Sequence, residues 1–128
     1  MALKNLEIIE SEGLVERVRD DTGPYLAEQL AKRLNGHPLV GETRSVGMMA
    51  AIEIVSDKAA RSRFLPAGSA AGRVRDHAIR NGLMARATDD TIIMSPPLMW
   101  TRQMIDLACD RLLVALDLAE ADLASQRG

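Results

Sequence analysis

The chain has 128 residues, of which 47% are hydrophobic and 27% charged, and its formal net charge is −2. This length fits one domain over residues 1–128, which can bury an apolar core without disulfide or metal cross-links. The slightly acidic balance and the presence of only three aromatic residues (1 Tyr, 1 Phe and 1 Trp) disfavour nucleic-acid binding, and no apolar run is long enough to span a membrane.

Apolar residues at helical spacing predict a short helix over about residues 2–12, built on Leu3, Leu6 and Ile9. The residues Met1-Ala2-Leu3-Lys4 offer no Ser, Thr, Asp or Asn to cap its first turn. The chain is therefore expected to begin inside a structural element, as a partial unit of a longer protein would.

A second helical stretch follows directly. Ser11 is expected to cap it, and Pro24 suits the first turn of a renewed helix, where a missing N–H costs little. The inner face of the helix that Pro24 begins carries a leucine every four residues, at Leu26, Leu30 and Leu34. Asn35-Gly36 predicts the end of this helix.

Residues 46–55 alternate with a period of two, which predicts a strand packed on one side. One face of this strand would carry Val46, Met48, Ala50, Ile52 and Ile54. The polar stretch over residues 56–68 predicts a loop. Ser69 is then expected to cap a helix over about residues 70–80.

The stretch GLMARATDDTIIMSPPL, residues 82–98, predicts a β-hairpin. Leu83–Ala87 and Thr91–Ser95 are its expected strands. Asp89-Asp90 marks the turn, and Pro96-Pro97 ends the second strand because proline has no N–H to donate to a ladder.

Thr101 is expected to cap a long final helix that runs to about residue 124. The predicted order is therefore α-α-β-α-β-β-α. This order indicates an α+β domain, in which helices cover a small antiparallel sheet of about three strands.

Few side chains in this chain offer catalytic chemistry. A lysine that forms a Schiff base needs a desolvated site. The three lysines all lie in polar or helix-surface contexts: Lys4, Lys32 and Lys58. Cys109 is the only cysteine, which excludes an internal disulfide, agrees with a reducing cytoplasmic location and predicts a small buried residue. His37 and His77 are too far apart for a metal-ligand motif, so no metal site is expected.

Arg86 stands out because it interrupts an apolar strand. On a strand it would share a face with Met84 and Thr88, opposite Leu83 and Ala85. One interpretation is a surface arginine whose stem lies over its apolar neighbours. The other is a carboxylate-binding residue, because a guanidinium can donate two parallel N–H···O bonds that lysine cannot reproduce. The residue pattern alone leaves both interpretations open.

Two long stretches resemble a known family. HPLVGETRSVGMMAAIEIVSDK (37–58) and RDHAIRNGLMARATDDTIIMSPPLMWTRQMIDLACDRLLVALD (75–117) are similar to the C-terminal small domain of class III aminotransferases, which are pyridoxal-phosphate enzymes of fold type I. The likeness is to the omega-amino acid and amine–pyruvate branch, which DDTGPYLAEQL (20–30) also resembles. The resemblance extends from about Leu3 to Leu118 and covers only the final part of a family chain.

The resemblance implies a role for Arg86. Gly82, Leu83, Arg86 and Ala87 match the family's GL-x-x-R-A motif, in which the arginine binds the substrate carboxylate and swings aside for a plain amine. The complete enzyme is then expected to move an amino group from an amine or omega-amino acid to pyruvate or a similar keto acid. The family usually has glycine where this chain has Asp89. If the turn needs a positive φ there, the penalty is on the order of 1 kcal/mol.

The resemblance also implies parts that this chain does not carry. The family's cofactor lysine, and the aspartate that pairs with the pyridine nitrogen, belong to a large domain with no match here. We therefore expect the chain alone to contribute no catalytic and no cofactor-binding residue, and to be inactive. It would expose the apolar surface that the large domain covers, and self-associate through it. The alternative is a non-catalytic α+β module that binds a carboxylate metabolite through Arg86.

Overall fold

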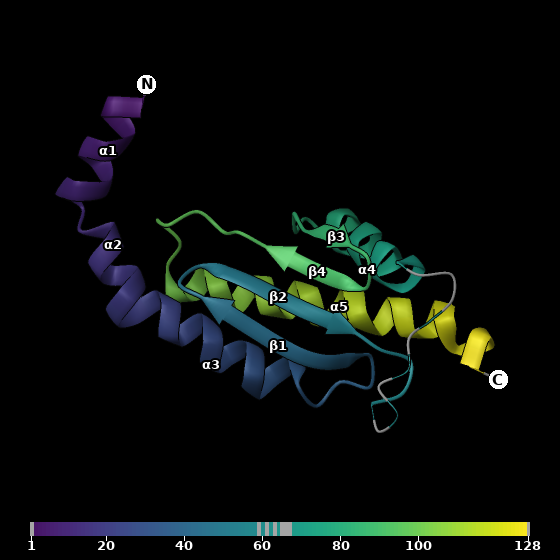
Figure 1. The fold of residues 1–128 in the computed structure, drawn as a ribbon. Helices are drawn as coiled ribbons and strands as arrows, with labels where there is room; N and C mark the ends of the chain where they lie inside the picture. Colours follow the sequence, from purple (N-terminus) through teal and green to yellow (C-terminus); the bar gives the residue numbers. More distant parts are fainter. Residues whose placement is uncertain (1, 59, 61, 63, 65–67, 128) are drawn as a thin grey trace.

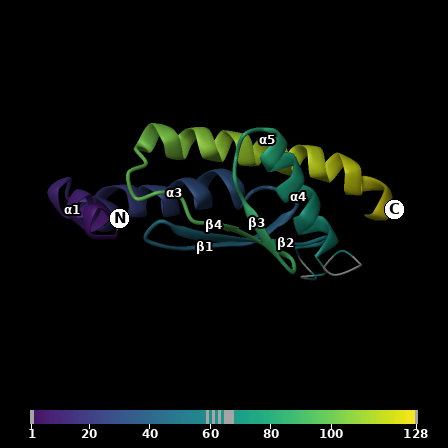
Figure 2. The same cartoon turned by 90° about the horizontal axis from the view of Figure 1, so that it is seen from above.

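The computed structural model describes residues 2–58, 60, 62, 64 and 68–127. Its elements follow in the order α1, α2, η1, α3, β1, β2, α4, β3, β4, α5 (Figure 1). Viewed from above, α3 and α5 lie on the same side of the sheet (Figure 2). The core fills the space between the helices and the sheet. Among the described residues, no helix has an apolar stretch sufficient to cross a membrane.

Residues 2–34 are almost continuously helical. They form α1 (Ala2–Ser11), α2 (Leu14–Arg17), the π-helical segment η1 (Val18–Thr22) and α3 (Gly23–Leu34). The predicted cap at Ser11 is wrong, because Ser11 ends α1 and the N-cap of α2 is Gly13. At that break the backbone has a φ of +61°, which glycine adopts without strain. The predicted leucine face of α3 is confirmed, since all three leucines are buried.

The predicted strand over residues 46–55 is in fact the second half of a hairpin. β1 (Val40–Val46) and β2 (Met49–Ile54) pair antiparallel, and the chain reverses at Gly47, where φ is +57°. Val46 therefore pairs with Met49 and is 84% exposed, on the opposite face from the one predicted. Apolar residues recur with a period of two across the turn, at Val46, Met48 and Ala50, so the sequence concealed the reversal although Val46 and Ala50 lie on opposite faces of the sheet.

The sheet has four strands in the order β1-β2-β4-β3, and all neighbouring pairs are antiparallel. β3 (Arg86–Thr88) and β4 (Thr91–Met94) form the predicted hairpin, although β3 is shorter than expected. The α+β class is confirmed, with four strands instead of about three because residues 40–54 supply two of them.

α4 (Ser69–Arg80) and α5 (Arg102–Arg127) pack against each other. The predicted cap of α4 is wrong by one residue. Its N-cap is Gly68 with a φ of +82°, and the hydroxyl of Ser69 makes no cap bond. The predicted cap of α5 is confirmed, because Thr101 Oγ1 accepts a hydrogen bond from the backbone N–H of Met104 at 3.4 Å.

α3 and α5 are joined by polar contacts between residues about 80 positions apart. The Tyr25 hydroxyl donates to the Asp106 carboxylate, and Arg33 donates to Asp110. One turn beyond α3, Nε2 of His37 lies 2.9 Å from Oδ1 of Asp117. The residue numbers rise together along both helices, so α3 and α5 run parallel. These contacts hold both helices over the same face of the sheet.

Candidate functional site on the uncovered face of the sheet

Arg86 is the first residue of β3, an edge strand of the sheet. Its side chain is exposed, as is that of Met84. Leu83 and Ala85, which alternate with these two residues along the chain, are buried on the side of the helices. The predicted alternation is therefore confirmed, and Arg86 points to the face that the helices leave uncovered. Arg86 makes no hydrogen bond or ion pair with the residues that the structure describes.

The register of the sheet shows which side chains surround Arg86. Arg86 pairs with Ile93, Ile93 with Ala51, and Ala51 with Arg44, so these four residues form one row across the uncovered face. Two arginines thus stand at the ends of the row, with two apolar side chains between them. An apolar floor excludes water beside a bound anion and strengthens its attraction to a guanidinium.

The two arginines of this row differ in their partners. Arg44 Nη1 donates to Oε2 of Glu42 at 3.1 Å and lies 3.9 Å from Oε2 of Glu53. These carboxylates neutralise its charge. Arg86 has no such acid among the described residues, so it is the arginine of the row that is free to bind an added carboxylate.

The turn that follows Arg86 is anchored on two sides. Asp90 is buried; its Oδ1 accepts a hydrogen bond from the N–H of Gly68 at 3.0 Å, and its carbonyl accepts one from Ile54 at 2.8 Å. Asp89 has a φ of +51°, in the left-handed region that glycine adopts freely. The turn does therefore need a positive φ at the position where the resembled family usually has glycine.

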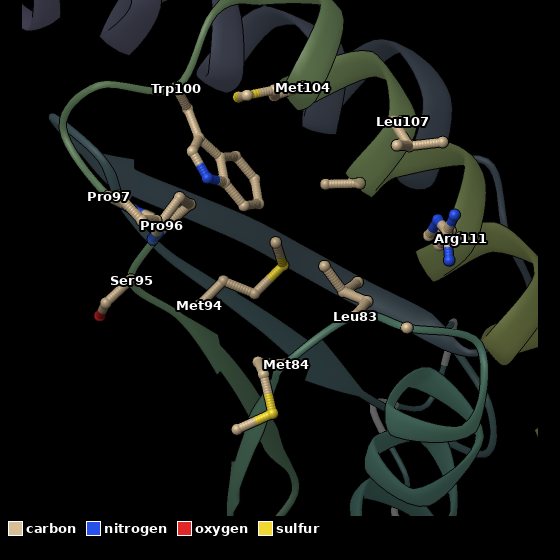
Figure 3. Close-up of a pocket in the computed structure, with 12 residues that line it drawn as sticks. Leu83, Met84, Met94, Ser95, Pro96, Pro97, Trp100, Met104, Leu107 and Arg111 are labelled. Atoms are coloured by element: carbon tan, nitrogen blue, oxygen red, sulfur yellow. The ribbon is translucent and has the colours of Figure 1, made fainter.

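A separate cavity of about 550 Å³ lies between the β3–β4 edge of the sheet and α5 (Figure 3). It is an apolar groove, and Arg86 is not part of its lining. Its main walls come from Leu83, Met94, Trp100, Met104, Leu107 and Arg111. The sequence did not predict this groove, although a dense run of Met, Pro and Trp over residues 94–100 indicates an apolar surface.

His37 gathers with two carboxylates of α5, a grouping that the sequence did not predict. Its Nε2 lies 2.9 Å from Asp117 and 3.5 Å from Glu120, and its Nδ1 accepts a hydrogen bond from the Leu39 N–H at 3.1 Å. Because Nδ1 is an acceptor, the neutral ring carries its proton on Nε2, where a metal would have to bind. This arrangement favours a hydrogen bond to Asp117 over a metal ligand set.

Comparison with solved structures defines the class of the protein. A transaminase structure with L-alanine has a TM-score of 0.89 and 37% sequence identity, over 96% of this chain and 28% of that chain. The omega transaminase of Pseudomonas jessenii in complex with PMP has a TM-score of 0.88 and 33% identity, over 96% of this chain and 27% of that chain. The fold is therefore one that transaminases contain.

The family is shown by sequence. The family model for class III aminotransferases matches residues 1–116, so this chain belongs to the class III aminotransferase family. The putrescine–pyruvate aminotransferase of Pseudomonas aeruginosa is 46% identical over 107 residues, which are 83% of this chain and 23% of that protein. The diaminobutyrate–2-oxoglutarate transaminase of Halomonas elongata is 42% identical over 106 residues, 81% of this chain and 22% of that protein.

The chain spans about a quarter of the length of the relatives that it matches. The relatives and structures named above are transaminases, so the alternative of a non-catalytic carboxylate-binding module is not favoured. Class III aminotransferases use pyridoxal phosphate, which raises the question of whether this chain's own residues fit that cofactor.

The described residues do not fit pyridoxal phosphate by themselves. The cofactor needs a desolvated lysine and donors for its phosphate, and all three lysines are exposed. Lys58 donates to the Asn35 carbonyl and lines a hollow of about 360 Å³, but Glu42 and Glu53 share that hollow and would repel a phosphate.

Proposed function

We propose that this chain is the C-terminal small domain of an omega-type aminotransferase, and that Arg86 binds the carboxylate of its substrates. The complete enzyme would move an amino group from an amine or omega-amino acid to pyruvate or a similar keto acid, with pyridoxal phosphate held by the remainder of the protein. One observation carries the proposal: Arg86 is an exposed arginine, without an acidic partner among the described residues, on the uncovered face of the sheet.

The surroundings of Arg86 support carboxylate binding. Its guanidinium can donate two parallel hydrogen bonds to the two oxygens of a carboxylate. Ile93 and Ala51 beside it carry no competing acceptor on their side chains. An unpaired, exposed arginine is also free to rotate away, which suits a site that alternates between a keto acid and a plain amine.

We further propose that the chain alone does not transaminate, because its described residues do not form a cofactor site. Its exposed apolar side chains would favour self-association. Three such side chains stand on the uncovered face: Val46, Met49 and Met84. The proposal includes a cytoplasmic location and small-molecule amines and keto acids as the substrates of the complete enzyme, with no nucleic-acid or membrane partner.

A chimera tests the role of Arg86. This chain would replace the matched segment of the Pseudomonas aeruginosa putrescine–pyruvate aminotransferase, and KM would be measured for each substrate separately. Arg86→Ala should raise KM for pyruvate about 10- to 100-fold, since a charge-assisted hydrogen-bond pair contributes about 1.5–3 kcal/mol. KM for putrescine should stay near its starting value, because putrescine has no carboxylate.

Arg44→Ala is the matched control, because Arg44 lies in the same row but is paired with Glu42. It should leave both KM values near those of the unmodified chimera. An unchanged KM for pyruvate in Arg86→Ala would show that Arg86 does not bind the carboxylate.

The isolated chain tests the expected inactivity. It would be mixed with pyridoxal phosphate, desalted, and scanned for visible absorbance before and after borohydride reduction. We expect no stoichiometric band to survive desalting, because the exposed lysines offer no desolvated site. A stable band that borohydride removes, together with turnover of an amine and pyruvate, would refute the inactivity.

A further inference from the structure

The groove beside α5 has features of a binding site that the transaminase reaction does not explain. Its volume of about 550 Å³ falls within the range of about 300–1,000 Å³ that is typical of small-molecule sites. Met104 and Leu107 of α5 form one wall, with Leu83 and Met94 across from them (Figure 3). Methionine side chains adapt their shape easily, so they suit a flexible aliphatic ligand.

The groove has a polar end. Trp100 and Arg111 lie at opposite ends of its lining, and Arg111 stands where α4 meets α5 (Figure 3). Arg111 is half-buried, and its Nη1 donates to the carbonyl of Asn81 at the end of α4. Its guanidinium also packs directly against Gly82, where a Cβ atom would collide with it. These contacts hold the guanidinium at the end of the groove.

The charge of Arg111 is not balanced by a carboxylate among the described residues. A guanidinium has five N–H donors, and the described contacts use one edge only, through Nη1. Nε and Nη2 therefore remain available. A half-buried cation with free donors at the end of an apolar groove is complementary to a ligand that has one anionic head and an apolar chain.

We propose that this groove binds an aliphatic monocarboxylate. The carboxylate pairs with Arg111, and the hydrocarbon chain lies against Met94, Leu107 and Trp100. The site is distinct from the one proposed for the transaminase substrate, because Arg86 is not part of the groove lining and points to the uncovered face of the sheet. The two proposals can therefore fail independently.

The only tryptophan of the chain reports on this site directly, because Trp100 lines the groove. Octanoate would be titrated into the full chain while the intrinsic fluorescence of Trp100 is recorded. Two matched probes separate the parts of the ligand: acetate has the head without the chain, and octylamine has the same chain with a positive head. We expect a saturable change with octanoate, at concentrations where acetate and octylamine produce none.

Arg111→Met keeps the apolar stem and removes the charge. It should weaken octanoate binding about tenfold or more, the effect of losing a charge-assisted pair. Arg44→Met is the control and should bind octanoate as the unmodified chain does, because Arg44 lies outside the groove lining and is paired with Glu42. Leu107→Asp provides a second test, for the case that Arg111→Met perturbs the end of α4. Leu107 is half-exposed, so the fold should tolerate this change. The new carboxylate should repel the carboxylate of octanoate and weaken its binding.

Three results would overturn the proposal. The first is octanoate binding that Arg111→Met and Leu107→Asp both leave unchanged. The second is equal binding of octylamine and octanoate, which would mean that the groove selects only for an apolar chain. The third is a concentration-dependent Trp100 signal without ligand, accompanied by a dimer in sedimentation, which would place a second copy of the chain in the groove.

Discussion

Asp89 carries a local conformational cost whose size can be worked out from its backbone. It has a φ of +51° and is the one non-glycine residue with a positive φ among those described. The left-handed region costs an ordinary L-residue about 1–2 kcal/mol, and Asp or Asn less. Asp89→Ala should therefore lower the free energy of unfolding by about 1 kcal/mol, whereas Asp89→Asn should leave it almost unchanged.

Asp89→Gly has two opposing effects. Glycine removes the strain of the turn, but it gives the unfolded chain additional freedom that costs about 0.5–1 kcal/mol on folding. The expected net change is within about 0.5 kcal/mol of zero. Asp89 is exposed and its side chain has no assigned hydrogen bond, so the series compares backbone conformations and not lost contacts.

Urea unfolding followed by Trp100 fluorescence measures all three variants, and a constant m-value would indicate that only stability has changed. The expected order of stability places the Asn and Gly variants together, near the unmodified chain, and the Ala variant below them. If Asp89→Ala were as stable as Asp89→Asn, the turn would not impose a left-handed conformation on residue 89.

Two further predictions concern burial. Ile92→Ala should lower the free energy of unfolding by about 2–5 kcal/mol because Ile92 is fully buried. Ile93→Ala, on the uncovered face, should lower it by less than half as much. Equal losses of stability in urea unfolding would contradict the orientation of β4. Burial also raises the pKa of the Cys109 thiol, so iodoacetamide should label this thiol at pH 8 only after the chain unfolds. Fast labelling of the native chain would contradict the burial of Cys109. The raised pKa means that the thiol's contribution to stability is fully present below its unfolded-state pKa of about 8.5 and is lost as the pH rises toward the folded-state pKa. Cys109→Ala should remove that alkaline decline.

Local patterns predicted the features of this fold that depend on neighbours in the chain. The leucine face of α3 is buried, as the helical period required. The alternation around Arg86 placed its side chain on the correct face of β3. The conformational cost at Asp89 was predicted because the resembled family usually has glycine at this position of the turn.

The errors occurred at turns that place a glycine at a positive φ. The two-residue reversal at Gly47-Met48 puts Val46 beside Met49, three positions further on, and therefore breaks the period of two. The sequence did not reveal this break because Val46, although apolar, is exposed. The caps at Ser11 and Ser69 were misassigned for a related reason. Both helices begin after a glycine with a positive φ, a conformation that the chain path requires and that a serine cannot easily adopt.

The sequence by itself determined the family, the α+β class and the face on which Arg86 lies, because each depends on residue order or on a short period. Only the tertiary structure decided that Arg86 has no acidic partner among the described residues while Arg44 has one, and that Leu83 at the edge of the sheet lines the same groove as Arg111 of α5. These features bring together side chains from different helices and strands. They depend on how the helices and strands pack in space, which no local period encodes.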